Sequence, residues 1–340
     1  MRRHRWLTAL ALLAALAPVM AAAGTGLTVY TDRHHKIVRA IFEGFTAESG
    51  VPVAMVDDEM ADILDRLHRE GAASPADLAV LVGAGALENL AAESMFQPMA
   101  ANATLRAVPE ALRDPGRLWV SLAWWARGVA YRKDRFRPED FKRYADLADP
   151  RFRGALLARS ASSPYNRALA SALIDAGGLA DTEAWAEGLV ANLARPPQGG
   201  DTDQLTALAN SEGGAALVNT RYWAKLAGDA KLTERETLDG LALAFPDQDA
   251  AGAAIDVIGA AILRHAPHPQ AAQALIDYLL RPDVQAVLAA DGPDFPASPQ
   301  AETPEVLKAL GPFKPDFAAL RRYGELENDA GRLLTRAGWE

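Results

Sequence analysis

Two groups of polar and aromatic residues lie where this chain could bind a ligand. One group, residues 219–223, follows an apolar strand-like run and opens a helix, and it includes Arg221 and Tyr222. The other contains His34 and His35, which follow the first strand-like run. In open α/β sheets, ligands bind beyond the carboxyl ends of strands, where helices begin. A phenol, an imidazole or a guanidinium at such a place can hold a metal ion or an anion, so we expect a binding crevice there.

The same residue types also occur without any ligand. A tyrosine is commonly a half-buried side chain whose hydroxyl is hydrogen-bonded, and a histidine at a helix start is commonly a surface or capping residue. His34 and His35 are adjacent, so their side chains diverge and we do not expect both to bind one ion. Residue type alone therefore leaves both interpretations open.

The sequence offers little for catalysis. His34 or His35 could act as a general base, but no nucleophile motif or second catalytic group accompanies them. The loop at Gly199 and Gly200 lacks the lysine and hydroxyl residue of a phosphate-binding loop, so we interpret it as a turn. With 0 cysteines, the chain has no thiolate nucleophile and no cysteine-ligated zinc or iron–sulfur site. We expect a binding protein and not an enzyme.

Length and charge narrow the class further. By length alone, 340 residues correspond to about two domains. Half of the residues are hydrophobic and 23% are charged, which is ordinary for a globular protein. The formal net charge of −9 argues against a broad nucleic-acid-binding surface.

The first residues have the pattern of a secretory signal peptide. Arg2, Arg3 and Arg5 precede an apolar run, and small residues close the segment at Ala23. The apolar run is too short to span a bilayer, and no later stretch is long and apolar enough to do so. We therefore expect residues 1–23 to be removed and the mature protein to be soluble, exported and periplasmic.

Alternating strand and helix patterns predict a parallel, doubly wound sheet near the N-terminus. Apolar residues at helical spacing between them predict helices that end near Gly50 and Gly71. A longer aromatic run and three later apolar runs read as strands, and a polar loop at residues 160–166 precedes a helix that starts near Arg167. The predicted strands are Leu27–Thr31, Val51–Val56, Leu78–Val82, Trp119–Tyr131, Ala155–Ala158, Ala215–Val218 and Ile255–Ile262.

Several motifs, taken in order, resemble those of one family. Residues 197–204 read PQGGDTDQ, and an N-T-R-Y run follows at residues 219–222. Near the end stand GPFKPDF at 311–317 and RAGW at 336–339. Together these motifs resemble the periplasmic ferric-iron-binding proteins of ABC importers, and the resemblance spans the mature chain from residue 27 to residue 339.

The resemblance implies an α/β, two-lobed periplasmic-binding-protein fold of type II. Each lobe is expected to be a doubly wound mixed sheet with flanking helices, and crossing strands are expected to form the hinge between the lobes. We expect the N-terminal lobe to comprise residues 24–126 and 252–302. The C-terminal lobe would comprise residues 127–251 and 303–340.

The resemblance also implies a set of metal ligands. Ferric iron favours hard, anionic oxygen donors and tolerates imidazole, and the charge of a metal lowers the pKa of a bound phenol. The family's ligand positions correspond here to His34 or His35, to Tyr165, and to Tyr222. A glutamate that another branch of the family uses after the third strand has no counterpart in this chain.

One departure from the family pattern concerns charge. Arg221 stands where the family has the first tyrosine of a pair, and a guanidinium cannot ligate a metal. It could instead bind a carbonate, phosphate or carboxylate, or turn out to solvent. Arg127 matches the second arginine of the family's R-x-R and is expected either to bind an anion or to form an ion pair.

The function implied by this resemblance is transport. We expect a soluble, monomeric substrate-binding component of an ABC importer, which captures Fe3+ with a synergistic anion such as carbonate. It would deliver the iron to a permease at the inner membrane. The alternative is the same fold binding an organic anion or an iron chelate through Arg221 and Arg127.

Overall fold

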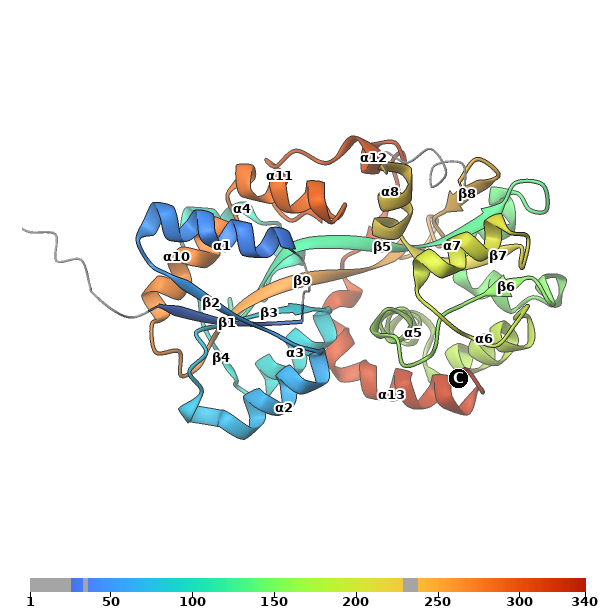
Figure 1. Ribbon diagram of the computed structural model, residues 1–340. Helices are drawn as coiled ribbons and strands as arrows, with labels where there is room; N and C mark the ends of the chain where they lie inside the picture. Colours follow the sequence, from blue (N-terminus) through green and yellow to red (C-terminus); the bar gives the residue numbers. More distant parts are fainter. Residues whose placement is uncertain (1–25, 33–35, 229–237) are drawn as a thin grey trace, which may run out of the picture.

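The computed structural model describes residues 26–32, 36–228 and 238–340 (Figure 1). The predicted signal peptide, residues 1–23, and both His34 and His35 lie outside the described residues. The strands are β1 (Leu27–Thr31), β2 (Val53–Asp57), β3 (Leu78–Val82), β4 (Phe96–Gln97), β5 (Val120–Arg132), β6 (Leu156–Leu157), β7 (Ala215–Asn219), β8 (Leu241–Ala244), β9 (Ala253–Leu263), β10 (Phe295–Pro296) and β11 (Pro315–Asp316). The helices are α1 (Lys36–Ser49), α2 (Met60–Glu70), α3 (Ala84–Ala92), α4 (Ala103–Ala107), α5 (Pro164–Gly177), α6 (Leu179–Ala191), α7 (Asp201–Ala209), α8 (Thr220–Gly228), α10 (Pro269–Leu279), α11 (Pro282–Asp291), α12 (Glu305–Lys308) and α13 (Tyr323–Arg336).

The N-terminal lobe is built on a parallel core of three strands. β1 pairs in parallel with both β2 and β3, as the alternating strand and helix pattern predicts. Gly50 has a φ of 75°, which is left-handed, and it follows the last residue of α1. Because β1 and β3 are parallel, their carboxyl ends point the same way, towards the second lobe.

Two long antiparallel strands, β5 and β9, run through both lobes (Figure 1). β5 pairs with β9 from Val120 to Ala126, and from Arg127 onwards it pairs with β7 of the C-terminal lobe. β9 also closes the N-terminal sheet by pairing antiparallel with β3. Hydrogen bonding thus links the described strands into one sheet, in which β2-β1-β3-β9-β5-β7-β6 form the main path and β4, β8, β10 and β11 pair with its two long strands. The expected two-lobed α/β fold with crossing strands is confirmed.

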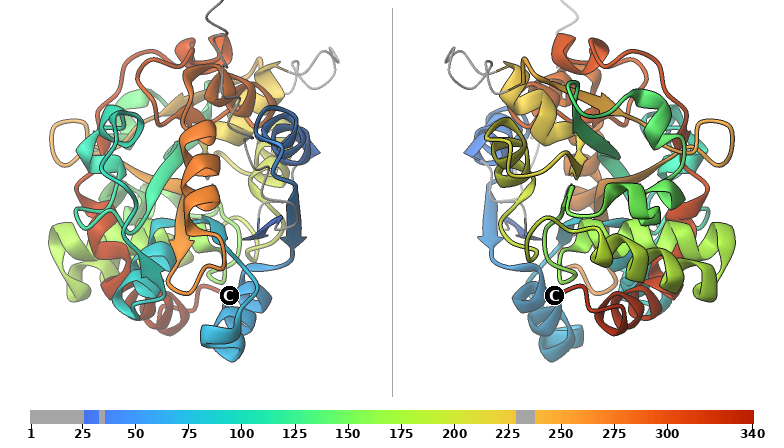
Figure 2. Two further views of the ribbon diagram at one scale, coloured as in Figure 1. Left: turned by 90° about the vertical axis from the view of Figure 1, so that its left-hand side faces the viewer. Right: turned by 90° about the vertical axis from the view of Figure 1, so that its right-hand side faces the viewer.

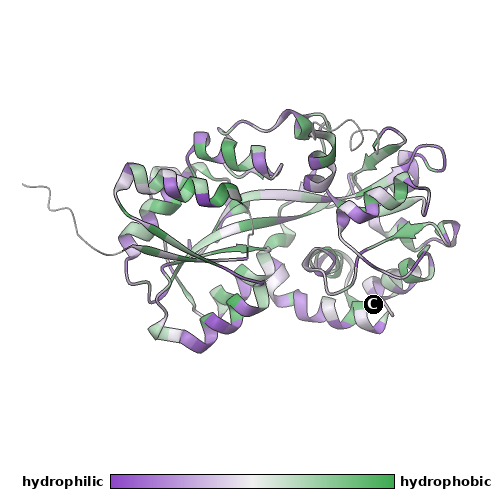
Figure 3. Cartoon of the chain, viewed as in Figure 1, coloured by the Kyte–Doolittle hydropathy of each residue, from purple (hydrophilic) through white to green (hydrophobic). Residues whose placement is uncertain are grey.

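Helices cover both sides of the strands in each lobe, as the two end views show (Figure 2). α13 packs against α3 of the N-terminal lobe and against α5 and α6 of the C-terminal lobe, so it joins the two beneath the crossing strands. Colouring by hydropathy shows apolar strands between helices with polar outer faces (Figure 3). Within the described ranges, no helix is long and apolar enough to cross a membrane.

Several predicted strands differ from the observed ones by one or two residues at an end, and one wrong boundary concerns a candidate ligand. Residues 160–166 were predicted to form a loop, but α5 begins at Pro164. Proline is favoured at the first position of a helix because its fixed φ suits the helix and its missing N–H needs no partner there. Tyr165 therefore lies in the first turn of α5 and not in a loop.

Candidate metal site between the lobes

Two of the predicted ligands meet at the edge of the C-terminal lobe. Tyr165 comes from the first turn of α5, and Tyr222 from the first turn of α8. Their hydroxyl oxygens lie 3.3 Å apart. The start of α8 is fixed to the crossing strand because the hydroxyl of Thr220 accepts a hydrogen bond from the backbone N–H of Ala126 at 3.1 Å. The structure thus brings Tyr165 and Tyr222 together although they are distant in sequence.

The ring of Tyr165 is held between an aromatic and a cationic side chain. The ring of Trp125 meets it edge-on at 5.7 Å, and the guanidinium of Arg159 lies 4.9 Å from its centre. Burial and the neighbouring Tyr222 raise the pKa of Tyr165, while Arg221 acts in the opposite direction. The hydroxyl of Tyr165 is therefore protonated at neutral pH.

Arg221 turns inward, and only 8% of it is exposed. Its guanidinium lies 5.2 Å from the ring centre of Trp125, and its Nη2 is 3.3 Å from Oδ2 of Asp294. Burial by itself lowers the pKa of Arg221, but Asp294 and the neighbouring tyrosines outweigh that effect and raise it. Of the two predicted orientations, the structure selects the one that faces the tyrosines, where Arg221 stays charged.

Arg127 is surrounded by protein oxygens. It is 3% exposed, and its Nη1 donates to Oδ2 of Asp201 at 2.7 Å and to Oδ1 of Asn219 at 3.0 Å. Its Nη2 donates to Oδ1 of Asn166 at 2.8 Å. Asn166 immediately follows Tyr165 and Asn219 closely precedes Tyr222, so Arg127 connects the segments that carry both phenols. Of the two predicted roles, this geometry favours the ion pair over anion binding.

The PQGGDTDQ loop forms the other half of this network. Gly199 has a φ of 66° and the backbone N–H of Gly200 donates to Oδ2 of Asp203, so the loop makes the expected turn. The turn starts α7 and buries Asp201 completely. Besides its bond with Arg127, Oδ2 of Asp201 accepts the backbone N–H of Asn219 at 2.7 Å. The loop therefore positions the segment that leads into Tyr222.

A cavity of about 520 Å³ lies between the lobes beside these groups. It is bordered by α2 and α3 on one side and by α5 and α13 on the other, and Pro164 of the first turn of α5 lines it. Asp256 of β9 and Glu327 of α13 also line it. Burial raises the pKa of Asp256 to about 7, and the charges of Glu327 and Asp32 add to the effect.

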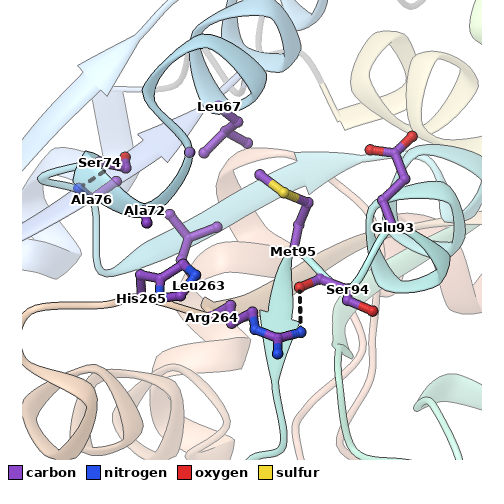
Figure 4. Close-up of a pocket in the computed structure, with 11 residues that line it drawn as sticks. Leu67, Ala72, Ser74, Ala76, Glu93, Ser94, Met95, Leu263, Arg264 and His265 are labelled. Carbon is purple, nitrogen blue, oxygen red and sulfur yellow. Dashed lines mark hydrogen bonds between the residues drawn. The ribbon is translucent and has the colours of Figure 1, made fainter.

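A smaller cavity of about 230 Å³ lies elsewhere in the N-terminal lobe (Figure 4). Its walls come from the end of α2, from the segment after α3 and from the end of β9, and include Leu67, Met95 and Leu263. Arg264 at its rim donates to the carbonyl of Ser94 at 3.4 Å. None of the predicted site residues lines this cavity.

Two residues of the site, Asp201 and Asp294, were not predicted from the sequence. Asp201 lies inside the PQGGDTDQ motif, and that motif was the signal that could have identified it. Asp294 stands in the loop between α11 and β10, where no motif marks it. Within the described part of the chain, no three histidine or acidic side chains are grouped to hold a metal ion.

Known proteins are similar to this chain in sequence and fold. The model of a family described as bacterial extracellular solute-binding protein matches residues 73–320. The Synechocystis sp. protein named iron uptake protein A1 is 32% identical over 314 residues, which cover 92% of this chain and 87% of the relative. The major ferric iron-binding protein of Neisseria meningitidis is 26% identical over 333 residues, covering 96% of this chain and 97% of that protein.

A solved structure agrees with this comparison. The Trichodesmium protein FutA (IdiA), determined in complex with iron and citrate ligands, is 32% identical to this chain. It superposes with a TM-score of 0.86 and covers 93% of this chain and 100% of its own. The chain thus belongs to the bacterial extracellular solute-binding protein family, together with these iron uptake and ferric-iron-binding proteins.

Proposed function

We propose that this protein is the soluble substrate-binding component of an ABC importer that captures ferric iron between its lobes. The observation that carries the proposal is the 3.3 Å separation between the hydroxyl oxygens of Tyr165 and Tyr222. One ion with bonds of about 2.1 Å could bind both oxygens at an angle of about 100°. Phenolate is a hard anionic donor that suits ferric iron. The iron-related names of the relatives agree with this cargo.

The remaining ligands are proposed from the sequence. A histidine from His34 or His35 would complete the protein's donor set from the N-terminal lobe, since both follow β1, whose carboxyl end points towards the second lobe. Water or a small anion such as carbonate would occupy the other coordination positions. Closure of the two lobes on the ion would then bring donors from both sides together.

Binding of an organic anion through Arg221 and Arg127 is the alternative. Both guanidiniums are buried, and each already has a carboxylate partner, Asp294 for Arg221 and Asp201 for Arg127. A ligand carboxylate would have to displace those partners. The geometry therefore favours iron as the cargo over an organic anion held by the two arginines.

The wider setting of the protein is also part of the proposal. We propose that residues 1–23 are removed on export and that the mature protein works in the periplasm as a monomer without enzymatic activity. It would hand its iron to a permease in the inner membrane. The lobes would comprise residues 24–126 with 252–302 and residues 127–251 with 303–340, in keeping with the change of partner along β5.

Dialysis separates the two candidate ligands. Metal-stripped mature protein is dialysed against ferric nitrilotriacetate, against zinc, or against citrate without metal, and the retained metal or citrate is measured. We expect one retained ferric ion per chain, much less zinc, and no retained citrate in the absence of iron. Retention of citrate without iron would favour the organic-anion alternative.

A further inference from the structure

The pair formed by Arg221 and Asp294 connects the two lobes at the tyrosine site. Arg221 opens α8 in the C-terminal lobe, whereas Asp294 follows α11 and precedes β10, which pairs with the N-terminal half of β5. Nη2 of Arg221 and Oδ2 of Asp294 are 3.3 Å apart, and the side chains are 9% and 1% exposed. A protein carboxylate thus occupies the place beside Arg221 that an external anion would take.

The position of Asp294 is fixed by its neighbours along the chain. Phe295 pairs with Trp124 on β5, and the two rings stack 4.3 Å apart at an interplanar angle of 16°. The next residue of β5, Trp125, lies under the guanidinium of Arg221. Two adjacent residues of β5 thus contact the two sides of the pair: Trp124 stacks on the neighbour of Asp294, and Trp125 packs against Arg221. In the wild-type protein, an external anion could reach Arg221 only by displacing the buried carboxylate that is paired with it.

The charge of Arg221 matters because it lies beside the proposed ligands. Its guanidinium is 5.7 Å from the ring centre of Tyr222 and interacts electrostatically with Tyr165. An unpaired guanidinium there would repel a trivalent cation strongly in a site with little water. Paired with Asp294, it contributes almost no net charge at a distance.

We propose that Asp294 is the built-in counter-anion of the iron site, so that no external anion is needed to neutralise Arg221. This inference rests on the proposed function, because it concerns iron binding at the same tyrosines. Asp294 acts through Arg221 and is a positioning residue, not an iron ligand. The protein would accordingly bind ferric iron with nearly the same affinity whether or not bicarbonate is present.

The test measures iron affinity against bicarbonate concentration. Wild-type protein and the Asp294→Asn variant are titrated with iron in carbonate-free buffer and in rising bicarbonate, at a constant concentration of nitrilotriacetate as the competing chelator. For wild type we expect the affinity to change by less than about threefold. For Asp294→Asn we expect a loss of at least about tenfold without bicarbonate, because a buried charge is left unpaired, and recovery when bicarbonate is added.

Two further variants control for charge and folding. Asp291→Asn removes an exposed carboxylate from the end of the helix before Asp294, and it should behave like wild type. The double variant Arg221→Met with Asp294→Asn removes both charges of the pair, so it should fold even where Asp294→Asn does not. Its iron affinity should again be independent of bicarbonate. The phenolate-to-iron absorption band should persist in every variant, because both tyrosines are intact.

Each other outcome has a distinct meaning. Equal dependence on bicarbonate in wild type and Asp294→Asn would overturn the inference, since the anion would then act at the metal and not at Arg221. The inference would also be overturned if wild type and Asp294→Asn bound iron with equal affinity and neither affinity depended on bicarbonate. Failure of the wild-type protein to bind iron under any condition would instead contradict the proposed function.

Discussion

Arg127 and Asp201 form an ion pair, with Nη1 and Oδ2 2.7 Å apart, whose side chains are only 4% and 0% exposed. Arg127 belongs to the crossing strand β5, and Asp201 is the first residue of α7. Since Asp201 also accepts the backbone N–H of Asn219, this pair fixes the segment that leads to Tyr222. The pair is therefore a structural support for the site, since both side chains are buried and bonded to each other.

Breaking this pair is expected to destabilise the protein strongly. Asp201→Asn leaves the buried Arg127 guanidinium without a counter-charge, which typically costs about 3–5 kcal/mol in the free energy of unfolding. Chemical denaturation at pH 7 measures that loss. Asp65→Asn is a suitable control because Asp65 pairs with Arg69 on the exposed surface of α2, where a charge pair contributes little. Equal stability of the two variants would contradict the structural role assigned to the pair.

The sequence indicated much of the scaffold but not its long-range pairs. β1 and β3 match their predicted ranges because their apolar runs are short and end at clear turn residues. Tyr165 was found through a motif, although its helix starts earlier than predicted because the proline at position 164 was interpreted as part of a loop. Local patterns thus located the elements and the phenols.

The charge partners could not be predicted in the same way. Arg127 and Asp201 are 74 residues apart, and periodicity says nothing about which charges meet after folding. The same holds for Arg221, whose partner Asp294 is brought near by the pairing of β10 with β5. Without that contact, the sequence could only leave open whether Arg221 faces an anion or solvent.

Tyr144 is expected to stabilise the crossing strands. Its hydroxyl donates to the carbonyl of Arg127 on β5 and accepts the backbone N–H of Ala254 on β9 at 3.1 Å. Tyr144→Phe leaves that buried N–H without a partner and should cost about 1–3 kcal/mol in the free energy of unfolding. Tyr323→Phe is the matched control, since it frees only the carbonyl of Ile255, and orphaned carbonyls are better tolerated. We therefore expect Tyr144→Phe to lower the free energy of unfolding more than Tyr323→Phe does, and the opposite order would contradict this role of Tyr144.

Asp256 should make the protein less stable as the pH rises towards neutrality. Its pKa in the folded protein is about 7, mainly because of burial, against an ordinary value of 3.8. At pH values between these two pKa values, the unfolded chain has lost the proton while the folded protein keeps it. The free energy of unfolding therefore falls from about pH 4 to about pH 7 and is constant above that. At about 1.4 kcal/mol per pH unit, the difference between 3.8 and about 7 corresponds to about 4 kcal/mol.

The Asp256→Asn variant isolates this effect. An amide oxygen can still accept the two backbone N–H groups, of Ala84 and Val257, that Oδ1 accepts. We expect the variant to be more stable than wild type at pH 8 and to match it near pH 4. Thermal unfolding across this pH range measures the difference between the two proteins. A constant difference at all pH values would show that the carboxyl does not titrate as described.

Iron binding should release protons. Burial raises the pKa of Tyr165, so its hydroxyl must lose a proton when it becomes a ligand. The affinity for ferric iron should therefore fall by at least about tenfold for each unit that the pH is lowered from 8 to 6. Titration in weakly buffered solution measures the released protons directly, with Tyr165→Phe releasing fewer than wild type. An affinity that does not change with pH would exclude a phenolate from this tyrosine.

The central claim is that Tyr165 and Tyr222 hold the iron, and one spectroscopic titration tests it most directly. Metal-stripped mature protein is titrated with ferric citrate, with and without bicarbonate, while the visible phenolate-to-iron charge-transfer band is recorded. Wild-type protein should form a coloured complex with one ion per chain, and the Tyr222→Phe variant should lose most of the colour. A wild-type protein that binds no iron, or a variant as coloured as wild type, would contradict the account.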